Sequence, residues 1–94
     1  MAQKKRLVFS ASFRKAYQQL PAPIQTKVDK QIYLFGENPG HPSLRVHQLR
    51  GAEGIWEDYI DIHYRFTFEI HEDYYLFRLV GTHDIPKKEN RKKG

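Results

Sequence analysis

The sequence contains no cysteine and no long apolar segment, and both absences narrow the class of protein. A chain without cysteine has no disulfide bonds and no thiolate to act as a nucleophile or metal ligand. A membrane-spanning helix needs about 18 or more consecutive apolar residues, and the apolar run in the N-terminal MAQKKRLVF is too short even for a signal peptide. We therefore expect a cytoplasmic protein that makes no membrane contact, with residues 1–94 forming one domain.

Lysine is absent from residues 31–86, and half of the positive charge lies at the two ends of the chain. Residues 7–86 carry eight basic and ten acidic side chains, so the net charge of +5 comes from the termini. We expect residues 88–94 to form a flexible basic tail, which is either simply solvated or in contact with a polyanion. Charge alone is therefore a weak indication of nucleic-acid binding.

The first half of the chain is typical of one short strand followed by two helices. RLVFS, at 6–10, has the composition of a strand. After it, apolar residues recur every three or four positions, as on the buried face of a helix. They are Phe13, Ala16, Tyr17 and Leu20, then Ile24, Val28, Ile32 and Phe35. Pro21 and Pro23 separate the two sets, so we expect a helical hairpin.

The second half alternates apolar and polar residues and predicts strands at 44–49, 55–61, 64–70 and 74–80. The short turns between these strands favour antiparallel pairing of neighbours. The predicted fold is α+β, an N-terminal strand, a helical hairpin and a four-stranded antiparallel meander in the order β-α-α-β-β-β-β. The helices are expected to cover one face of the sheet, leaving the other face open.

Histidine is frequent, at positions 41, 47, 63, 71 and 83, but the spacings are not those of metal ligands, so we expect no metal and no cofactor. His47, His63 and His83 lie in or at the ends of predicted strands. If these ends converge on the open face beside Arg65, Glu57 and Asp61, the cluster has the parts for metal-independent RNA cleavage. Imidazoles would act as base and acid, and a cation would stabilise the phosphorane.

Every basic residue between 31 and 86 is an arginine, the side chain that binds phosphate through two nitrogens. Arg45 and Arg78 are also suited to ion pairs with acids on neighbouring strands. Trp56 is suited either to stacking on a base or to packing in the core. These alternatives stay open at the level of sequence.

Four segments in this order resemble the RelE/ParE superfamily of bacterial toxin–antitoxin toxins, in particular its YafQ-like branch. They are the HxLxG at 47–51, the aromatic strand GIWEDYID at 54–61, the YR at 64–65 and the VGTH at 80–83. The resemblance implies a RelE-like fold and a ribosome-dependent endoribonuclease that cuts mRNA in the ribosomal A site and so inhibits translation. It also implies a cognate antitoxin as partner, with the ribosome and mRNA as further partners.

Carried over position by position, the resemblance implies that His47, His63 and His83 are catalytic histidines and that Arg65 steadies the scissile phosphate. Asp61 would orient an imidazole. The chain departs from the YafQ-like pattern in two places: the hairpin after His63 is shorter, and no aromatic residue follows His83. It also lacks the lysines and the terminal tyrosine that other RelE members use.

The RNA and ribosome contacts expected from composition are Arg45, Arg50, Trp56, Arg78, Lys87 and Lys88. Two other functions remain possible on the same fold. One is a ParE-like toxin that binds DNA gyrase and needs no histidine cluster. The other is an inactive relative that only binds the antitoxin.

Overall fold

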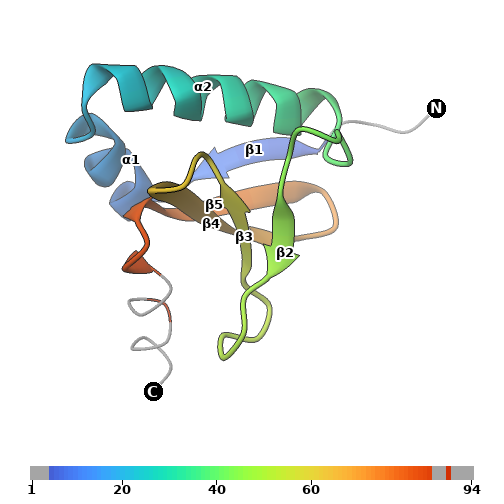
Figure 1. The fold of residues 1–94 in the computed structure, drawn as a ribbon. Helices are drawn as coiled ribbons and strands as arrows, with labels where there is room; N and C mark the ends of the chain where they lie inside the picture. Colours follow the sequence, from blue (N-terminus) through green and yellow to red (C-terminus); the bar gives the residue numbers. More distant parts are fainter. Residues whose placement is uncertain (1–4, 86–88, 90–94) are drawn as a thin grey trace.

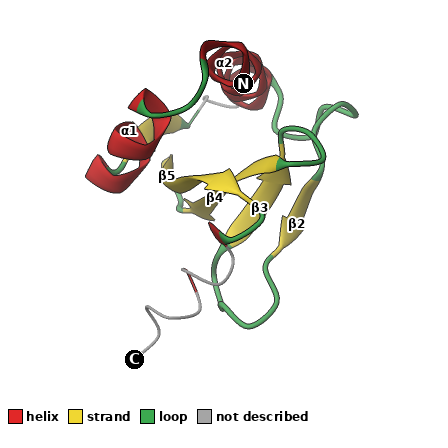
Figure 2. Ribbon diagram, turned by 60° about the vertical axis from the view of Figure 1, so that its left-hand side comes forward, coloured by secondary structure: helices red, strands yellow, loops and turns green. Residues whose placement is uncertain are grey.

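The structure, a computed structural model, describes residues 5–85 and residue 89. Its elements are β1 (Arg6–Phe9), α1 (Ala11–Gln18), α2 (Ala22–Glu37), β2 (Val46–Gln48), β3 (Trp56–Tyr59), β4 (Tyr64–Ile70) and β5 (Tyr74–Thr82). Both helices lie on the same side of the sheet (Figures 1 and 2). Within the described residues, no helix is both long and apolar enough to cross a membrane.

The five strands form one sheet in the order β1-β5-β4-β3-β2. Strands β2 to β5 pair antiparallel with their neighbours in sequence, which confirms the predicted meander. The N-terminal strand pairs parallel with β5, and this places the beginning of the chain beside its last strand. β2 begins later than predicted because the backbone N–H of Arg45 donates to the Asp58 carboxylate, at 2.8 Å, instead of to a strand carbonyl.

Local chemistry sets the ends of the two helices. Ser10 caps α1, since its Oγ accepts a hydrogen bond from the Phe13 backbone N–H at 3.0 Å. The same hydroxyl donates to the carbonyl of Arg78 and so joins the start of α1 to β5. Pro21 and Pro23 flank the start of α2, where proline costs no helical hydrogen bond.

Phenylalanine rings fill the space between the helices and the sheet. Phe13 of α1 and Phe35 of α2 pack on Phe66, Phe68 and Phe77 of β4 and β5, all at most 3% exposed. The ring centroids of Phe35 and Phe68 are 4.8 Å apart in an edge-to-face arrangement, which aromatic rings favour. This cluster lies on the strand face that the apolar alternation predicted.

The opposite face of the sheet is not open, contrary to the expectation from sequence. Thr67, which points away from the helices, is fully buried, and its hydroxyl donates to Glu89 Oε2 at 2.7 Å. Arg78 Nε donates to the same carboxylate at 2.9 Å, and Arg78 Nη1 donates to Glu69. Glu89, which lies within the predicted flexible tail, is 4% exposed. Its neighbours at 86–88 and 90–94 lie outside the described residues. The flexibility of residues 88–94 stays a prediction.

We expect Glu89→Gln to lower the free energy of unfolding by about 1–3 kcal/mol, because it leaves the part-buried Arg78 without one of its two carboxylates. Urea unfolding measures the change. Glu72→Gln, at an exposed position in the turn between β4 and β5, is the matched control and should leave the midpoint unchanged. Equal midpoints for the two variants would show that Glu89 does not hold the C-terminal segment.

Candidate active site

The pairing of β2, β3 and β4 places four polar and aromatic side chains on the sheet face opposite the helices. His47 lies opposite Glu57, and Tyr59 lies opposite Arg65. Directly paired residues point to the same face of a sheet, and so do residues two apart on one strand. The four side chains therefore share one face and lie close enough to interact.

Glu57 is the centre of this group. It is 2% exposed, and its Oε1 lies 2.9 Å from His47 Nε2 and 3.9 Å from Arg65 Nη1. Tyr59 lies on the other side, with its ring 4.9 Å from the imidazole ring and 4.6 Å from the Arg65 guanidinium carbon. One carboxylate and one aromatic ring thus hold a histidine and an arginine in fixed relative positions.

Arg65 retains unused hydrogen-bonding capacity. Its side chain is 16% exposed, and the distance of 3.9 Å from its Nη1 to Glu57 Oε1 exceeds that of a hydrogen bond. Its Nε is buried and has no hydrogen-bond partner among the described residues, so the terminal nitrogens are the ones that can meet a ligand. A guanidinium with free donors is suited to an anion such as a phosphate. The stacking on Tyr59 orients the group without consuming its N–H donors.

A cleft of about 640 Å³ lies beside this group. It is lined by Gln31, Ser43, Arg45, Tyr59, Ile60, Asp61, Ile62 and Arg65. Two arginines and a tyrosine on one cleft are suited to a phosphate and a stacked base. Of the predicted RNA contacts, Arg45 lines this cleft, whereas Arg50 is exposed in the turn between β2 and β3.

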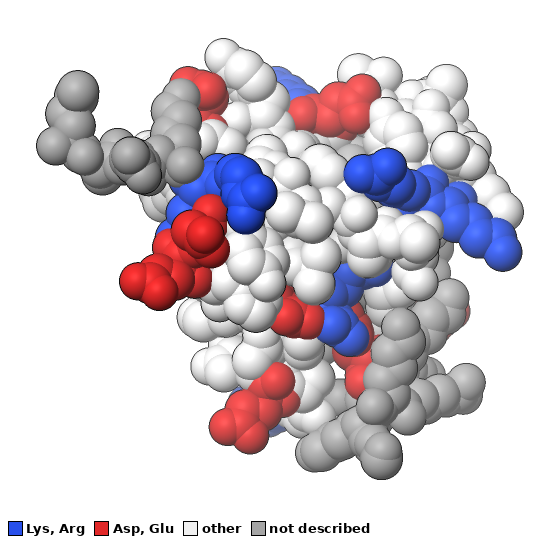
Figure 3. Space-filling view, turned by 180° about the vertical axis from the view of Figure 1, so that it is seen from behind, with Lys and Arg blue, Asp and Glu red and all other residues white. Residues whose placement is uncertain are grey.

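Basic side chains do not form one continuous surface on the face shown in Figure 3, where acidic groups lie beside them. Arg78, predicted to bind RNA, is paired with Glu69 and Glu89. Its hydrogen bonds to Glu89, more than those to Glu69, raise the pKa of Arg78 above its usual value. Lys87 and Lys88 lie outside the described residues.

Trp56 packs against the hydrophobic cluster on the helix side of the sheet, opposite Phe68. Trp56 is therefore part of the hydrophobic packing, and its predicted contact with RNA is not supported.

The structure brings only part of the predicted histidine cluster together. Tyr64 and Thr82 form the last residue pair between β4 and β5. His63 immediately precedes Tyr64 in the sequence, and His83 immediately follows Thr82. Both side chains are exposed, and that of His83 is 73% exposed with Nε2 3.6 Å from Asp84. Among the described residues, no hydrogen bond or ion pair joins either of them to His47.

The turn that carries His83 is held in place by the packing of Ile85, two residues further along the chain. Ile85 is 3% exposed, and a Cβ on Gly81 would lie only 3.1 Å from the Ile85 side chain. Gly81 pairs with Arg65. The absence of a side chain at Gly81 thus lets the chain fold back over the sheet directly next to the arginine.

Asp61 has a different role from the one expected. Its Oδ1 accepts the backbone N–H groups of His63 and Tyr64, each at 2.8 Å, and its Oδ2 pairs with Lys27 of α2 at 3.1 Å. Burial alone would raise the pKa of Asp61, but the His63 N–H, the Lys27 ammonium and the Tyr64 N–H outweigh it and lower the pKa. Asp61 therefore shapes the β3–β4 turn, and within the described chain its carboxylate contacts no imidazole.

Glu57 is expected from the sequence near the histidine cluster, but no local pattern gives it a role in the site. The spacing of His47 and Glu57 on two strands joined by a turn could have indicated that the two side chains meet. This conclusion requires the exact register of the two strands. That register depends on the turn at 51–54, where Gly51 and Gly54 adopt positive φ of 83° and 81°. Glycine adopts these angles without steric cost.

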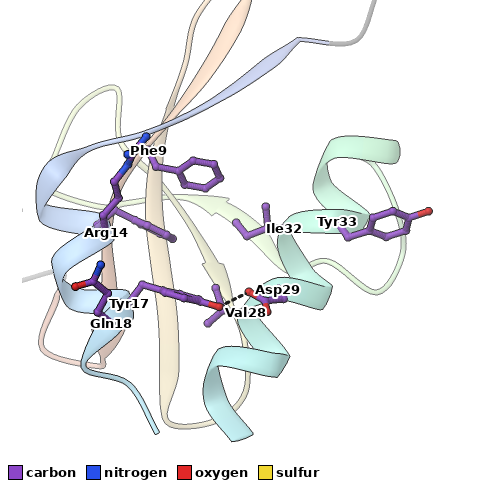
Figure 4. Close-up of a pocket in the computed structure, with 9 residues that line it drawn as sticks. Phe9, Arg14, Tyr17, Gln18, Val28, Asp29, Ile32 and Tyr33 are labelled. Carbon is purple, nitrogen blue, oxygen red and sulfur yellow. Dashed lines mark hydrogen bonds between the residues drawn. The ribbon is translucent and has the colours of Figure 1, made fainter. Parts of the chain in front are cut away.

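A second hollow, of about 530 Å³, lies between the helices and contains none of the histidines (Figure 4). Tyr17 of α1 donates to Asp29 of α2 at 2.6 Å across it, and this bond raises the pKa of Tyr17. Tyr33 lies at its outer edge and is 67% exposed. Nowhere in the described residues do three histidine or acidic side chains gather as metal ligands would.

No protein-family model matches the sequence, and no curated protein is similar to it in sequence. Solved structures of toxins are similar in fold. A chain of the E. coli DinJ–YafQ toxin–antitoxin complex gives a TM-score of 0.75 at 16% identity, over 88% of this chain and 97% of that one. A chain of the RelB–RelE antitoxin–toxin complex from Methanococcus jannaschii gives a TM-score of 0.71 at 17% identity, over 86% of this chain and 95% of that one.

YoeB from Staphylococcus aureus is similar to the same degree, with a TM-score of 0.71 at 14% identity, over 86% of this chain and 99% of that one. This chain therefore has the fold of the YafQ, RelE and YoeB toxins of toxin–antitoxin systems. The RelE-like fold implied by the sequence segments is confirmed.

Asp58 is a buried carboxylate on the helix side of the sheet. It is 0% exposed, and its Oδ2 has no hydrogen-bond partner in the described part of the chain. Burial raises the pKa of Asp58 to about 6, and the Arg45 N–H, the nearby His47 and the Tyr59 N–H oppose this only in part. The folded state therefore binds this proton more tightly than the unfolded chain does.

Because its folded pKa is raised, the contribution of Asp58 to stability is complete below about pH 4 and is lost as the pH rises through about 6. We expect Asp58→Asn, which keeps an oxygen to accept the Arg45 N–H, to raise the free energy of unfolding above pH 7 by ~2 kcal/mol. Between about pH 4 and 7 the variant should depend less on pH than wild type.

Urea unfolding across this pH range measures the difference. Asp73→Asn, at an exposed position in the turn between β4 and β5, is the matched control and should follow wild type. Parallel curves for wild type and Asp58→Asn would contradict the raised pKa.

Proposed function

We propose that this protein is the toxin of a type II toxin–antitoxin pair and that it cleaves mRNA on the ribosome without a metal. The observation that carries the proposal is the His47–Glu57–Arg65 group beside the cleft. The toxin fold supports it as well. A base, a phosphate-binding cation and a cleft with an aromatic wall are what cleavage by the neighbouring 2′-hydroxyl requires.

In the proposed reaction, one imidazole removes the proton of the 2′-hydroxyl while the 2′-oxygen forms a bond to phosphorus. Arg65 donates hydrogen bonds to the phosphate as negative charge builds on it. The bond from phosphorus to the 5′-oxygen then breaks, and a second imidazole protonates that oxygen. The products are a 2′,3′-cyclic phosphate and a 5′-hydroxyl, and the electrons balance without metal or redox partner.

The charge distribution supports dependence on the ribosome. Residues 7–86 carry a net charge of −2, and among the described arginines Arg78 is already neutralised by Glu69 and Glu89. RNA binding by a free nuclease depends on a broad cationic surface, and the face in Figure 3 has none. We propose that the ribosome positions the mRNA and that the cleft of this protein supplies the chemistry.

An antitoxin is the proposed protein partner. DinJ and RelB occur in the solved complexes of toxins with this fold. We expect the partner protein to suppress the toxicity of this chain when the two are produced together. We also propose that the protein acts in the cytoplasm, where ribosomes are present.

We expect His83→Ala to reduce mRNA cleavage in a cell-free translation reaction by about 10²- to 10⁴-fold, the usual effect of losing a general acid or base. Primer extension detects the cuts. His71→Ala is the matched control, because His71 follows β4 at the opposite end of the β4–β5 pair, and it should cleave like wild type.

Two results would contradict the proposal. If His83→Ala gave the wild-type cleavage pattern, His83 would have no catalytic role. If purified protein cut naked mRNA as fast as ribosome-bound mRNA, the ribosome dependence would be wrong. Arrest of growth with no new mRNA cuts, but with loss of gyrase activity, would favour the ParE-like alternative.

A further inference from the structure

We propose that Glu57 is a positioning residue that holds His47 with its proton on Nε2, so that His47 is the general base of the reaction. This inference rests on the proposed RNA cleavage and assigns a role that the histidines alone leave open. Glu57 lies on β3, between His47 on β2 and Arg65 on β4.

The hydrogen bond determines which ring nitrogen carries the proton. A carboxylate can only accept, so at 2.9 Å from Glu57 Oε1 the Nε2 of His47 must be the donor. In the neutral ring the other nitrogen, Nδ1, then has a free lone pair. Nδ1 has no hydrogen-bond partner among the described residues, and the side chain is 41% exposed. This nitrogen is therefore available to the 2′-hydroxyl.

The carboxylate also favours the product of the proton transfer. Once Nδ1 accepts the proton, the ring is positively charged and lies against the negative charge of Glu57, which is shielded from water at 2% exposure. The interaction is thus stronger after the transfer than before it. A group with this property accelerates the step rather than only binding the substrate.

The position of Arg65 is compatible with this assignment. Arg65 Nη1 is 3.9 Å from the same Oε1, so its attraction to Glu57 does not use a short hydrogen bond. The guanidinium remains free for the phosphate while Glu57 Oε1 accepts the hydrogen bond from His47 Nε2. The proton for the 5′-oxygen must then come from another imidazole, and we assign it to His83, at the end of β5 next to the Arg65–Gly81 pair.

The test is to remove the charge of Glu57 and to measure both the histidine tautomer and the cleavage rate. In wild type at alkaline pH, ¹⁵N NMR should show His47 mainly as the Nε2–H tautomer. Glu57→Gln, whose amide can donate as well as accept, should give a mixture of the two tautomers. Cleavage in cell-free translation should fall by about 10- to 100-fold, as for other residues that orient a functional histidine.

Controls separate positioning from folding. Glu53→Gln, the same change at an exposed site in the 51–54 turn, should leave tautomer and rate as in wild type. Glu57→Asp, which keeps the charge, should recover part of the lost rate. Urea unfolding verifies that each variant is folded, and if both Glu57 variants fail to fold, Glu57 is a structural residue and the proposal is overturned.

The two readouts also separate this inference from the proposed function. An unchanged tautomer in folded Glu57→Gln, or the Nδ1–H tautomer in wild type, would overturn the positioning role whatever the cleavage rate. The expected tautomers in a wild-type protein that cuts no mRNA on the ribosome would refute the nuclease function and leave the hydrogen-bond assignment intact.

Discussion

The packing of phenylalanine rings from the helical hairpin onto one face of the sheet is the constraint on which the rest of the structure depends. Phe13 and Phe35 cover Phe66, Phe68 and Phe77 so completely that these rings are almost inaccessible to water. Side chains alternate along a strand, so a shift of one residue in register would expose this cluster. Once the register is set, Arg65, next to Phe66, must face the other way, as must Tyr59, which pairs with it, and Glu57, which pairs with His47. The candidate site consists of these residues.

Two neighbouring carboxylates on β3 illustrate how strongly the face determines the chemistry. Glu57 points away from the helices, where it meets His47 and Arg65. Asp58 points toward the helices, where burial raises its pKa to about 6 and a backbone N–H from Arg45 is its partner. The first carboxylate organises a site, and the second shapes the chain before β2 at a cost in stability at neutral pH.

The face opposite the helices is organised by residues distant in sequence. Glu89 anchors the chain after β5 to Thr67 and Arg78, and Ile85 packs over Gly81. These contacts hold the turn at the end of β5, which carries His83 two residues after Gly81, the partner of Arg65 in the β4–β5 pair. The proposed active site therefore relies on the C-terminal segment for its geometry as much as on the strands themselves.

The sequence by itself determined the order of elements, the helical hairpin, the antiparallel meander and the importance of His47 and Arg65 as candidates, because these follow from local periodicity and residue chemistry. Only the tertiary structure decided which strand β1 joins, that Arg78 is neutralised and that Asp61 holds a turn. It also decided that Glu57 lies between a histidine and an arginine. Each of these depends on contacts between strands or segments whose register and spacing no local pattern specifies.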